Sequence, residues 1–229
     1  MGRMRGGLLL IAAAAIGTTG CGGSSSVKGD ADTGDQKASE TMKVEAVRTW
    51  LDLDGTKPYD NSAVAVVRNT GDKIADGVTI KLTWPNGYHT KQDESIVVPP
   101  GKQAVFVLGP FRPPPDVKGN PKAEVFVDSL KPSKGDAPVK ISGFKQSGCS
   151  LTGKTSNTFK KAHPGVNGFV AGLRDGKIVT GGSIFFEEPG LIPGDEGTFK
   201  ATLEPLCPEG KVDEWVAYPN LSVQDLTNP

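Results

Sequence analysis

The chain has 229 residues, with 26 basic and 26 acidic side chains and therefore no formal net charge. This balance argues against a general binder of nucleic acids or anionic membranes, which would carry an excess of basic residues. Glycine and proline make up about a fifth of the chain, less than the roughly 25–30% typical of disordered sequences. The composition therefore predicts a folded protein with many turns, and the length allows one large or two small domains.

Residues 1–20 have the three-part pattern of a secretory signal peptide. Arg3 and Arg5 precede an apolar run over residues 7–17, and small residues follow it. The run is shorter than the roughly 20 residues that a membrane-spanning helix requires. The pattern therefore predicts export, which places the rest of the chain outside the cytoplasm.

The end of this segment determines the predicted location. Thr19, Gly20 and Cys21 resemble the lipobox of bacterial lipoproteins, in which a small pair precedes a cysteine. The resemblance implies that Cys21 is lipidated, with palmitate among its acyl chains, and becomes the new N-terminus. It also implies anchorage at the outer face of the cytoplasmic membrane. Thr18 departs from the pattern, where an aliphatic residue is usual, which leaves open ordinary cleavage to a soluble secreted product.

Residues 21–40 are rich in glycine, serine and polar residues and show no apolar period. We expect a flexible tether, which in a chain of this length spans about 24 Å. The folded part would then stand just clear of the lipid headgroups.

From residue 43 onward the apolar residues recur with a period of two, which is typical of strands. Val78, Ile80, Leu82 and Trp84 would face a core, and Pro85 would end that strand. The predicted strands cover residues 44–51, 63–68, 78–84, 95–98, 103–108, 124–130, 139–144, 150–155, 166–173, 177–186, 197–203 and 213–218. Short strands separated by turn residues favour antiparallel β-sandwiches.

The two halves of this strand series look like copies of one unit. In each copy an Asn is followed nine residues later by a Val, and a Pro-Gly pair leads at equal spacing to a Phe. These landmarks are Asn69, Val78, Gly101 and Phe106 in the first copy, and Asn157, Val166, Gly194 and Phe199 in the second. We therefore expect two tandem sandwiches, over residues 41–133 and 136–229, joined by a polar linker.

This order of strands and turns resembles the FxLYD-type Ig-like modules of secreted bacterial lipoproteins. Ala65, Val67 and Asn69, and later Gly153, Thr155 and Asn157, approximate that family's strand ending in Asn. The family signature is eroded, with Ala171, Leu173, Arg174 and Asp175 at its place in the second copy. The resemblance implies an all-β, Ig-like fold and a surface interaction role, and it implies no chemistry.

Three cysteines occur, and lipidation of Cys21 would leave Cys149 and Cys207 as a pair. Export places them where a disulfide persists. We expect a bridge, with two buried free thiols as the alternative.

Motifs for catalysis are weak. Residues 148–155 match the P-loop pattern, but Pro164 and Gly165 would stop the helix that a P-loop needs. Only His89 and His163 are present, without metal-ligand spacing. We therefore predict no catalytic, cofactor or metal residues.

One loop is a candidate for partner binding. Phe111 and Arg112 precede Pro113, Pro114 and Pro115, which cannot enter a sheet interior. We expect this segment to be stiff and exposed, with a rigid crossover between sheets as the alternative.

The sequence favours a membrane-anchored, non-catalytic interaction module of the cell envelope. Its partner would be an envelope protein or a wall polymer. Two alternatives remain open at this point: an unrecognised envelope hydrolase, and an accessory lipoprotein of a transporter or of an envelope-stress signalling system.

Overall fold

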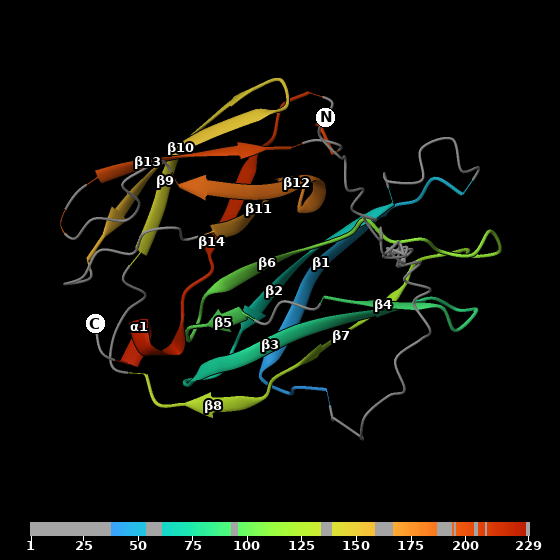
Figure 1. Cartoon of the computed structure of the whole chain (residues 1–229), viewed down its shortest axis with the longest axis horizontal. Coiled ribbons are helices and arrows are strands. Elements are labelled where there is room, and N and C mark those ends of the chain that lie inside the picture. The colour runs from blue at the N-terminus through green and yellow to red at the C-terminus, as the bar shows by residue number, and fades with distance from the viewer. Residues whose placement is uncertain are drawn as a thin grey trace, which may run out of the picture. The chain divides into compact units, whose positions relative to one another are not determined.

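A computed structural model describes residues 38–53, 61–92, 96–133, 139–158, 167–186, 194, 196–203, 206–208 and 210–227. The described part is built from antiparallel strands, with one short helix, α1 (Val223–Thr227), near its end (Figure 1). The predicted signal peptide and Cys21 lie outside the described residues. No helix in the described ranges has the length and apolar character that crossing a membrane requires.

The first eight strands form two sheets that face each other. One sheet has the order β1-β2-β6, and the other is arranged around β3. Their bounds are β1 (Met42–Trp50), β2 (Ser62–Asn69), β3 (Ile74–Thr83), β4 (His89–Lys91), β5 (Ile96–Val98), β6 (Gln103–Leu108), β7 (Lys122–Phe126) and β8 (Ser129–Lys131). Apolar side chains from both sheets, including Ala65, Ile80 and Phe106, form a common core in which each of these three is fully buried.

The remaining strands form one six-stranded sheet of order β14-β11-β12-β13-β10-β9. The bounds are β9 (Val139–Ser147), β10 (Ser150–Asn157), β11 (Asn167–Arg174), β12 (Lys177–Phe186), β13 (Glu196–Thr202) and β14 (Glu214–Pro219). Leu151, Ile184 and Phe199 form its buried cluster with other apolar residues of the same sheet. The sheet curls, because Phe144 of β9 stacks on Trp215 of β14, from the opposite edge, with centroids 6.2 Å apart.

We call β1–β8 the first strand set and β9–β14 the second strand set. The sequence landmarks occupy equivalent places in these two strand sets. Ala65 pairs with Phe106, and Gly153 pairs with Phe199, at the same offsets from the two asparagines. The Gly101 N–H donates to the Asn69 carbonyl at 2.9 Å, and the Gly194 N–H donates to the Asn157 carbonyl at 2.9 Å. The order β1-β2-β6 thus matches β9-β10-β13 in pairing and register.

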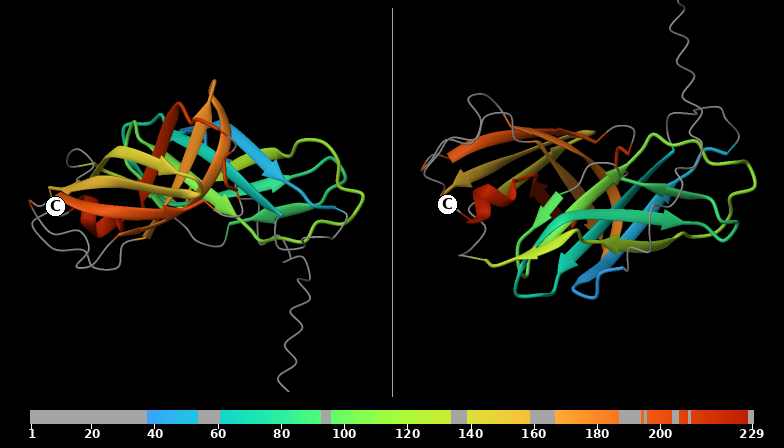
Figure 2. Two further views of the ribbon diagram at one scale, coloured as in Figure 1. Left: turned by 90° about the horizontal axis from the view of Figure 1, so that it is seen from above. Right: turned by 60° about the horizontal axis from the view of Figure 1, so that its bottom comes forward.

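A shared apolar layer joins the two strand sets. Val64 and Val66 of β2 and Val105 of β6 pack in one cluster with residues of the six-stranded sheet, namely Ala171, Leu173, Ile178 and Val216. The Tyr218 hydroxyl of β14 also donates to the Val97 carbonyl of β5. Residues Gln36–Pro229 accordingly form one compact unit, in which Figure 2 shows the two strand sets from two further sides. The division into 41–133 and 136–229 stays a prediction.

The end of the chain covers another part of the first strand set. Leu221 and Leu226 are buried against Ile74 and Val97, and Val139 of β9 belongs to the same cluster. Leu221 and helix α1 therefore complete a core whose other buried members are Ile74 and Val97, more than 100 residues earlier, and Val139 at the start of β9.

The predicted all-β, antiparallel sandwich class is confirmed. The strands at 103–108 and 177–186 have the predicted bounds, and the prediction of one strand over 124–130 is wrong. Strand β3 bends at Gly77, where φ is +68° and a Cβ would lie 2.2 Å from a carboxylate oxygen of Asp128. The segment predicted as one strand is divided at the same place, so that β7 pairs with one end of β3 and β8 pairs with the other end. Strand β4 was not predicted, because its sequence His-Thr-Lys has no apolar alternation.

Candidate functional site

The candidate site is an open groove of about 410 Å³ between β1 and the turn that joins β11 to β12. Its lining residues are Glu45, Ala46, Val47 and Arg48 from β1, with Gly176, Lys177 and Ile178 from the turn and the start of β12. Two elements distant in sequence therefore form its walls, and four consecutive residues of one strand form its longer side.

The strand alternation shows which parts of β1 face the groove. Ala46 and Arg48 pair with Val66 and Val64, so they lie on the face that packs against the six-stranded sheet. Val47 pairs with Ala65 and packs in the core of the first strand set, on the opposite face. Val47 therefore lines the groove with its backbone, and Gly176 has only backbone to offer. Among the described residues β1 pairs with β2 alone, so this backbone belongs to a sheet edge that is free in that part of the chain.

Two cationic side chains border the groove. The Arg48 Nη1 atom donates to the Ile178 carbonyl at 2.9 Å, and the guanidinium lies 4.9 Å from the centre of the Trp50 ring. Lys177 is exposed and is presented by a tight turn, in which Asp175 has φ of 49° and Gly176 has φ of 71°. Within the described residues neither Arg48 nor Lys177 contacts a carboxylate.

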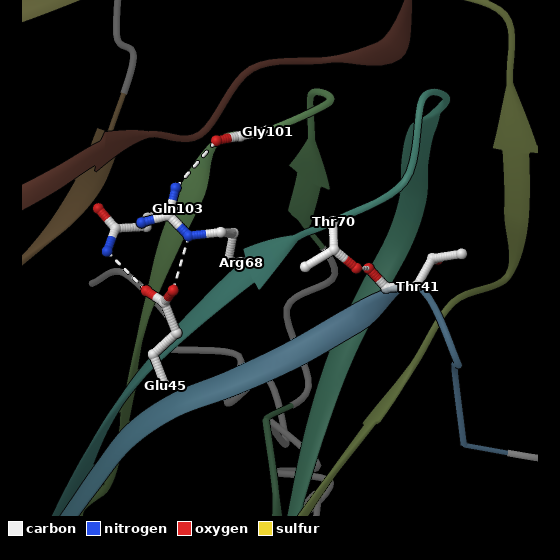
Figure 3. Close-up of polar contacts among 6 residues, drawn as sticks. All are labelled: Thr41, Glu45, Arg68, Thr70, Gly101 and Gln103. Atoms are coloured by element: carbon white, nitrogen blue, oxygen red, sulfur yellow. Dashed lines mark hydrogen bonds and ion pairs between the residues drawn. The ribbon is translucent and has the colours of Figure 1, made fainter.

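Glu45, the acidic residue that lines the groove, takes part in a hydrogen-bonded network with side chains of its own sheet (Figure 3). Glu45 Oε1 accepts from Arg68 Nε at 2.6 Å, and Glu45 Oε2 accepts from Gln103 Nε2 at 2.6 Å. The Arg68 Nη1 atom also donates to the Gly101 carbonyl at 3.1 Å. Beside this network, the Thr70 hydroxyl donates to the Thr41 carbonyl at 2.9 Å. The network ties all three strands of the sheet together at one end.

The environment of Glu45 favours its charged form. Partial burial by itself raises the pKa of this carboxyl, but hydrogen bonds from Arg68 and Gln103 and the charges of Arg68 and Lys43 outweigh it. The pKa of Glu45 is therefore lower than its ordinary value. Glu45 also lies at a β-bulge between Val44 and Ala46, which turns its side chain toward Arg68 and Gln103.

We expect Glu45→Gln to have a small effect that depends on pH. A lowered pKa in the folded state means that the network stabilises the protein above the unfolded pKa of about 4.5, and that this contribution is lost as the pH falls through the folded pKa. Because the pair is partly exposed, the loss at neutral pH should be under about 1 kcal/mol. Urea unfolding near neutral pH and near pH 3 measures it, and a wild-type advantage that grows in acid would contradict the assignment.

The structure corrects the prediction of an exposed apolar loop at Phe111. This side chain is only 8% exposed and its ring packs against Trp84 and Tyr88, with centroids 5.8 and 6.5 Å away. Phe111 closes one end of the first core, because its segment crosses from β6 in one sheet to β7 in the other. The predicted alternative, a crossover between sheets, is what the structure has.

The rest of that loop keeps some exposed surface. Arg112 and Pro115 are exposed, whereas Pro113 and Pro114 are half-buried. A partner-binding role for these residues stays a prediction, and Phe111 is not available to contribute to it.

Cys149 and Cys207 form a disulfide, as predicted, with their Cα atoms 4.8 Å apart. Cys149 immediately precedes β10, and its carbonyl accepts from the Leu203 N–H at 2.9 Å. Cys207 is exposed and follows Leu206, which is buried in the layer shared by the two strand sets. The bridge therefore holds the segment between β13 and β14 against the start of β10.

The residues that match the P-loop pattern do not form a P-loop. Residues from Ser150 to Asn157 form β10, whose backbone pairs with β9 on one side and β13 on the other. Those N–H groups are engaged in the sheet, so they do not form a phosphate-binding turn before a helix. Among the described residues no cluster of three His, Cys, Asp or Glu side chains is placed to hold a metal ion.

Comparisons with protein-family models, curated proteins and solved structures find no match to this chain. The resemblance to FxLYD-type modules and to lipoproteins therefore stays a prediction from the residues quoted above. What the fold defines is the class, an all-β antiparallel sandwich protein with a groove along an edge strand.

Sequence reasoning missed the groove residues Glu45, Arg48 and Lys177. The strand alternation of β1 did contain a signal, because Lys43, Glu45 and Arg48 place three exposed charges in a strand whose apolar residues are buried or half-buried. No local pattern indicated that Lys177 would lie beside them, since Arg48 and Ile178 are 130 residues apart in sequence.

Proposed function

We propose that this protein is a lipid-anchored, non-catalytic interaction module on the outer face of a bacterial cytoplasmic membrane. The observation that carries the interaction role is the groove along the free edge of β1, bordered by Arg48 and Lys177. Backbone groups and charges that face solvent in a concave site are typical of protein recognition.

The proposed location rests on the sequence around Cys21. A charged start, a short apolar run and Thr19-Gly20-Cys21 together favour lipidation after export. Two or three acyl chains hold a protein durably at a membrane, whereas a single chain gives marginal binding. The Cys149–Cys207 disulfide suits the same oxidising location.

The proposed partner is another protein of the envelope. An accessory role in a transporter or in stress signalling would use the same module and differs only in the identity of that partner. A wall polymer is the alternative ligand.

Cys21→Ser is expected to abolish anchoring without unfolding the protein. Wild-type protein should fractionate with membranes and leave them only in detergent, whereas the variant should appear in the medium or remain as uncleaved precursor. Fractionation with immunoblotting measures this, and in-cell cross-linking in the same cultures tests partner capture. Normal processing and unchanged detergent-only extraction of the variant would contradict the lipoprotein proposal, and failure of the wild type to cross-link any envelope protein would contradict the interaction role.

A further inference from the structure

We infer that the groove binds an extended, acidic peptide segment of a partner protein, which adds to the free edge of β1 as a new strand. This inference rests on the proposed interaction function and names the chemistry of its ligand. Three observations carry it: a strand edge lined by backbone, a second wall formed by the β11–β12 turn, and two cations without a carboxylate partner in the described part of the protein.

The backbone of β1 offers the hydrogen bonds. Within the described residues β1 pairs with β2 alone, so every second residue of β1 directs its N–H and C=O away from the sheet. Val47 lines the groove with these backbone atoms, because its side chain packs on the opposite face. An extended peptide satisfies such groups by main-chain pairing, which is the mechanism of strand addition.

The turn between β11 and β12 limits what can occupy the groove. Gly176, Lys177 and Ile178 form the wall facing β1, and the hydrogen bond from Arg48 to the Ile178 carbonyl fixes where the two walls meet. The four β1 residues of the groove span roughly 13 Å, about the length of four residues of an added strand. A single extended chain of about four residues matches this length of strand edge.

The charges favour acidic side chains on that peptide. Glu45 is neutralised by Arg68 and also accepts from Gln103, whereas Arg48 and Lys177 contact no carboxylate in the described ranges. Lys43 pairs across from Arg68 and adds a third cation on the same face. These charges and the bulge at Glu45 also discourage unselective pairing of this edge with other strands.

A labelled peptide of alternating Val and Glu, eight residues long, is a direct probe for the purified full-length protein. We expect saturable binding by fluorescence anisotropy, weakening as salt is raised. Replacing every Glu of the peptide by Lys should abolish binding. Two further peptides carry N-methyl groups at the odd or at the even positions. Each lacks the N–H donors along one edge of the extended peptide, because successive N–H groups point to opposite edges. One of the two should lose binding and the other should retain it.

Lys177→Glu is the matched change in the protein, because Lys177 is exposed at the start of β12 and forms no ion pair with a carboxylate among the described residues. Reversing the charge of Lys177 should lower the affinity of the protein for the acidic peptide about tenfold. Lys145→Glu is the control, because it makes the same charge change at an exposed position of β9, an edge strand of the six-stranded sheet. It should leave peptide binding unchanged.

Several outcomes would overturn the inference. These are no saturable binding of the acidic peptide, equal binding of the Lys peptide, equal behaviour of the two N-methylated peptides, or equal loss in Lys177→Glu and Lys145→Glu. A dimer that Lys177→Glu dissociates would replace the peptide by a second copy of the chain. Cross-linking in cells separates this inference from the proposed function, because partner capture that survives Lys177→Glu would leave the interaction role standing and remove the groove from it.

Discussion

Val66→Asp is expected to unfold both strand sets in a single transition. Val66 is 1% exposed and lies in the layer shared by β2, β6 and the six-stranded sheet. The substitution removes an apolar side chain worth about 1.5–3 kcal/mol of burial, and it places an unpaired carboxylate where water is excluded. The combined loss should exceed about 4 kcal/mol, a large part of the roughly 5–15 kcal/mol that a domain possesses.

Hydrogen exchange measured separately for β3 and β10 is the decisive measurement. Both strands should lose protection in Val66→Asp, because each belongs to a core that borders the shared layer. Thr152→Asp is the control, since it adds the same charge on β10 at an exposed position. Lost protection in β3 with full protection in β10 would show that the halves unfold independently, as the predicted division into 41–133 and 136–229 implies.

Removing the disulfide by Cys149→Ala together with Cys207→Ala should lower the melting temperature by roughly 10 °C. The two residues are 58 apart in sequence, and closure of a loop of that size is worth up to about 4 kcal/mol. The bridge also holds the segment containing Leu206, whose carbonyl accepts from the buried Thr180 hydroxyl. The loss should therefore reach the shared layer and appear as a shift of the whole transition.

Calorimetry of the wild type with and without a dithiol reductant provides the matching comparison. Reduction should bring the wild type to the melting temperature of the double variant, and the reductant should leave the variant itself unchanged. Mass spectrometry after alkylation reports whether the thiols were free at the start. A double variant whose melting temperature equals that of the wild type would show that the bridge contributes no stability.

The predictable part of this fold is the part encoded locally. Val78, Ile80 and Leu82 alternate with polar residues and are fully buried in β3, because side chains of a strand alternate between its faces. Asn69 and Asn157 were recognised from spacing alone, and both carbonyls accept from the glycine of the matching turn. The cysteine number, taken with the predicted export, was enough to predict the Cys149–Cys207 bridge.

The unpredicted part depends on packing between distant segments. Three prolines after Phe111 indicated an exposed loop, yet the preceding ring is buried because Trp84 and Tyr88 leave space for it at the end of the sheets. The groove requires the β11–β12 turn to lie against β1, and neither segment carries a pattern that specifies the other. The bend at Gly77 likewise divides its partner strand through a contact with Asp128 that sequence spacing does not reveal.

The position of Leu221 and Leu226 has a consequence for the order in which the protein is made. The first strand set is synthesised well before Leu221 and Leu226. Ile74 and Val97 therefore lack their contacts with these two residues while the second strand set is synthesised. The Val97 carbonyl lacks its Tyr218 partner during the same interval. The core of the first strand set is thus completed by residues that follow the second set, and a chain that stops before residue 218 would leave that core uncovered.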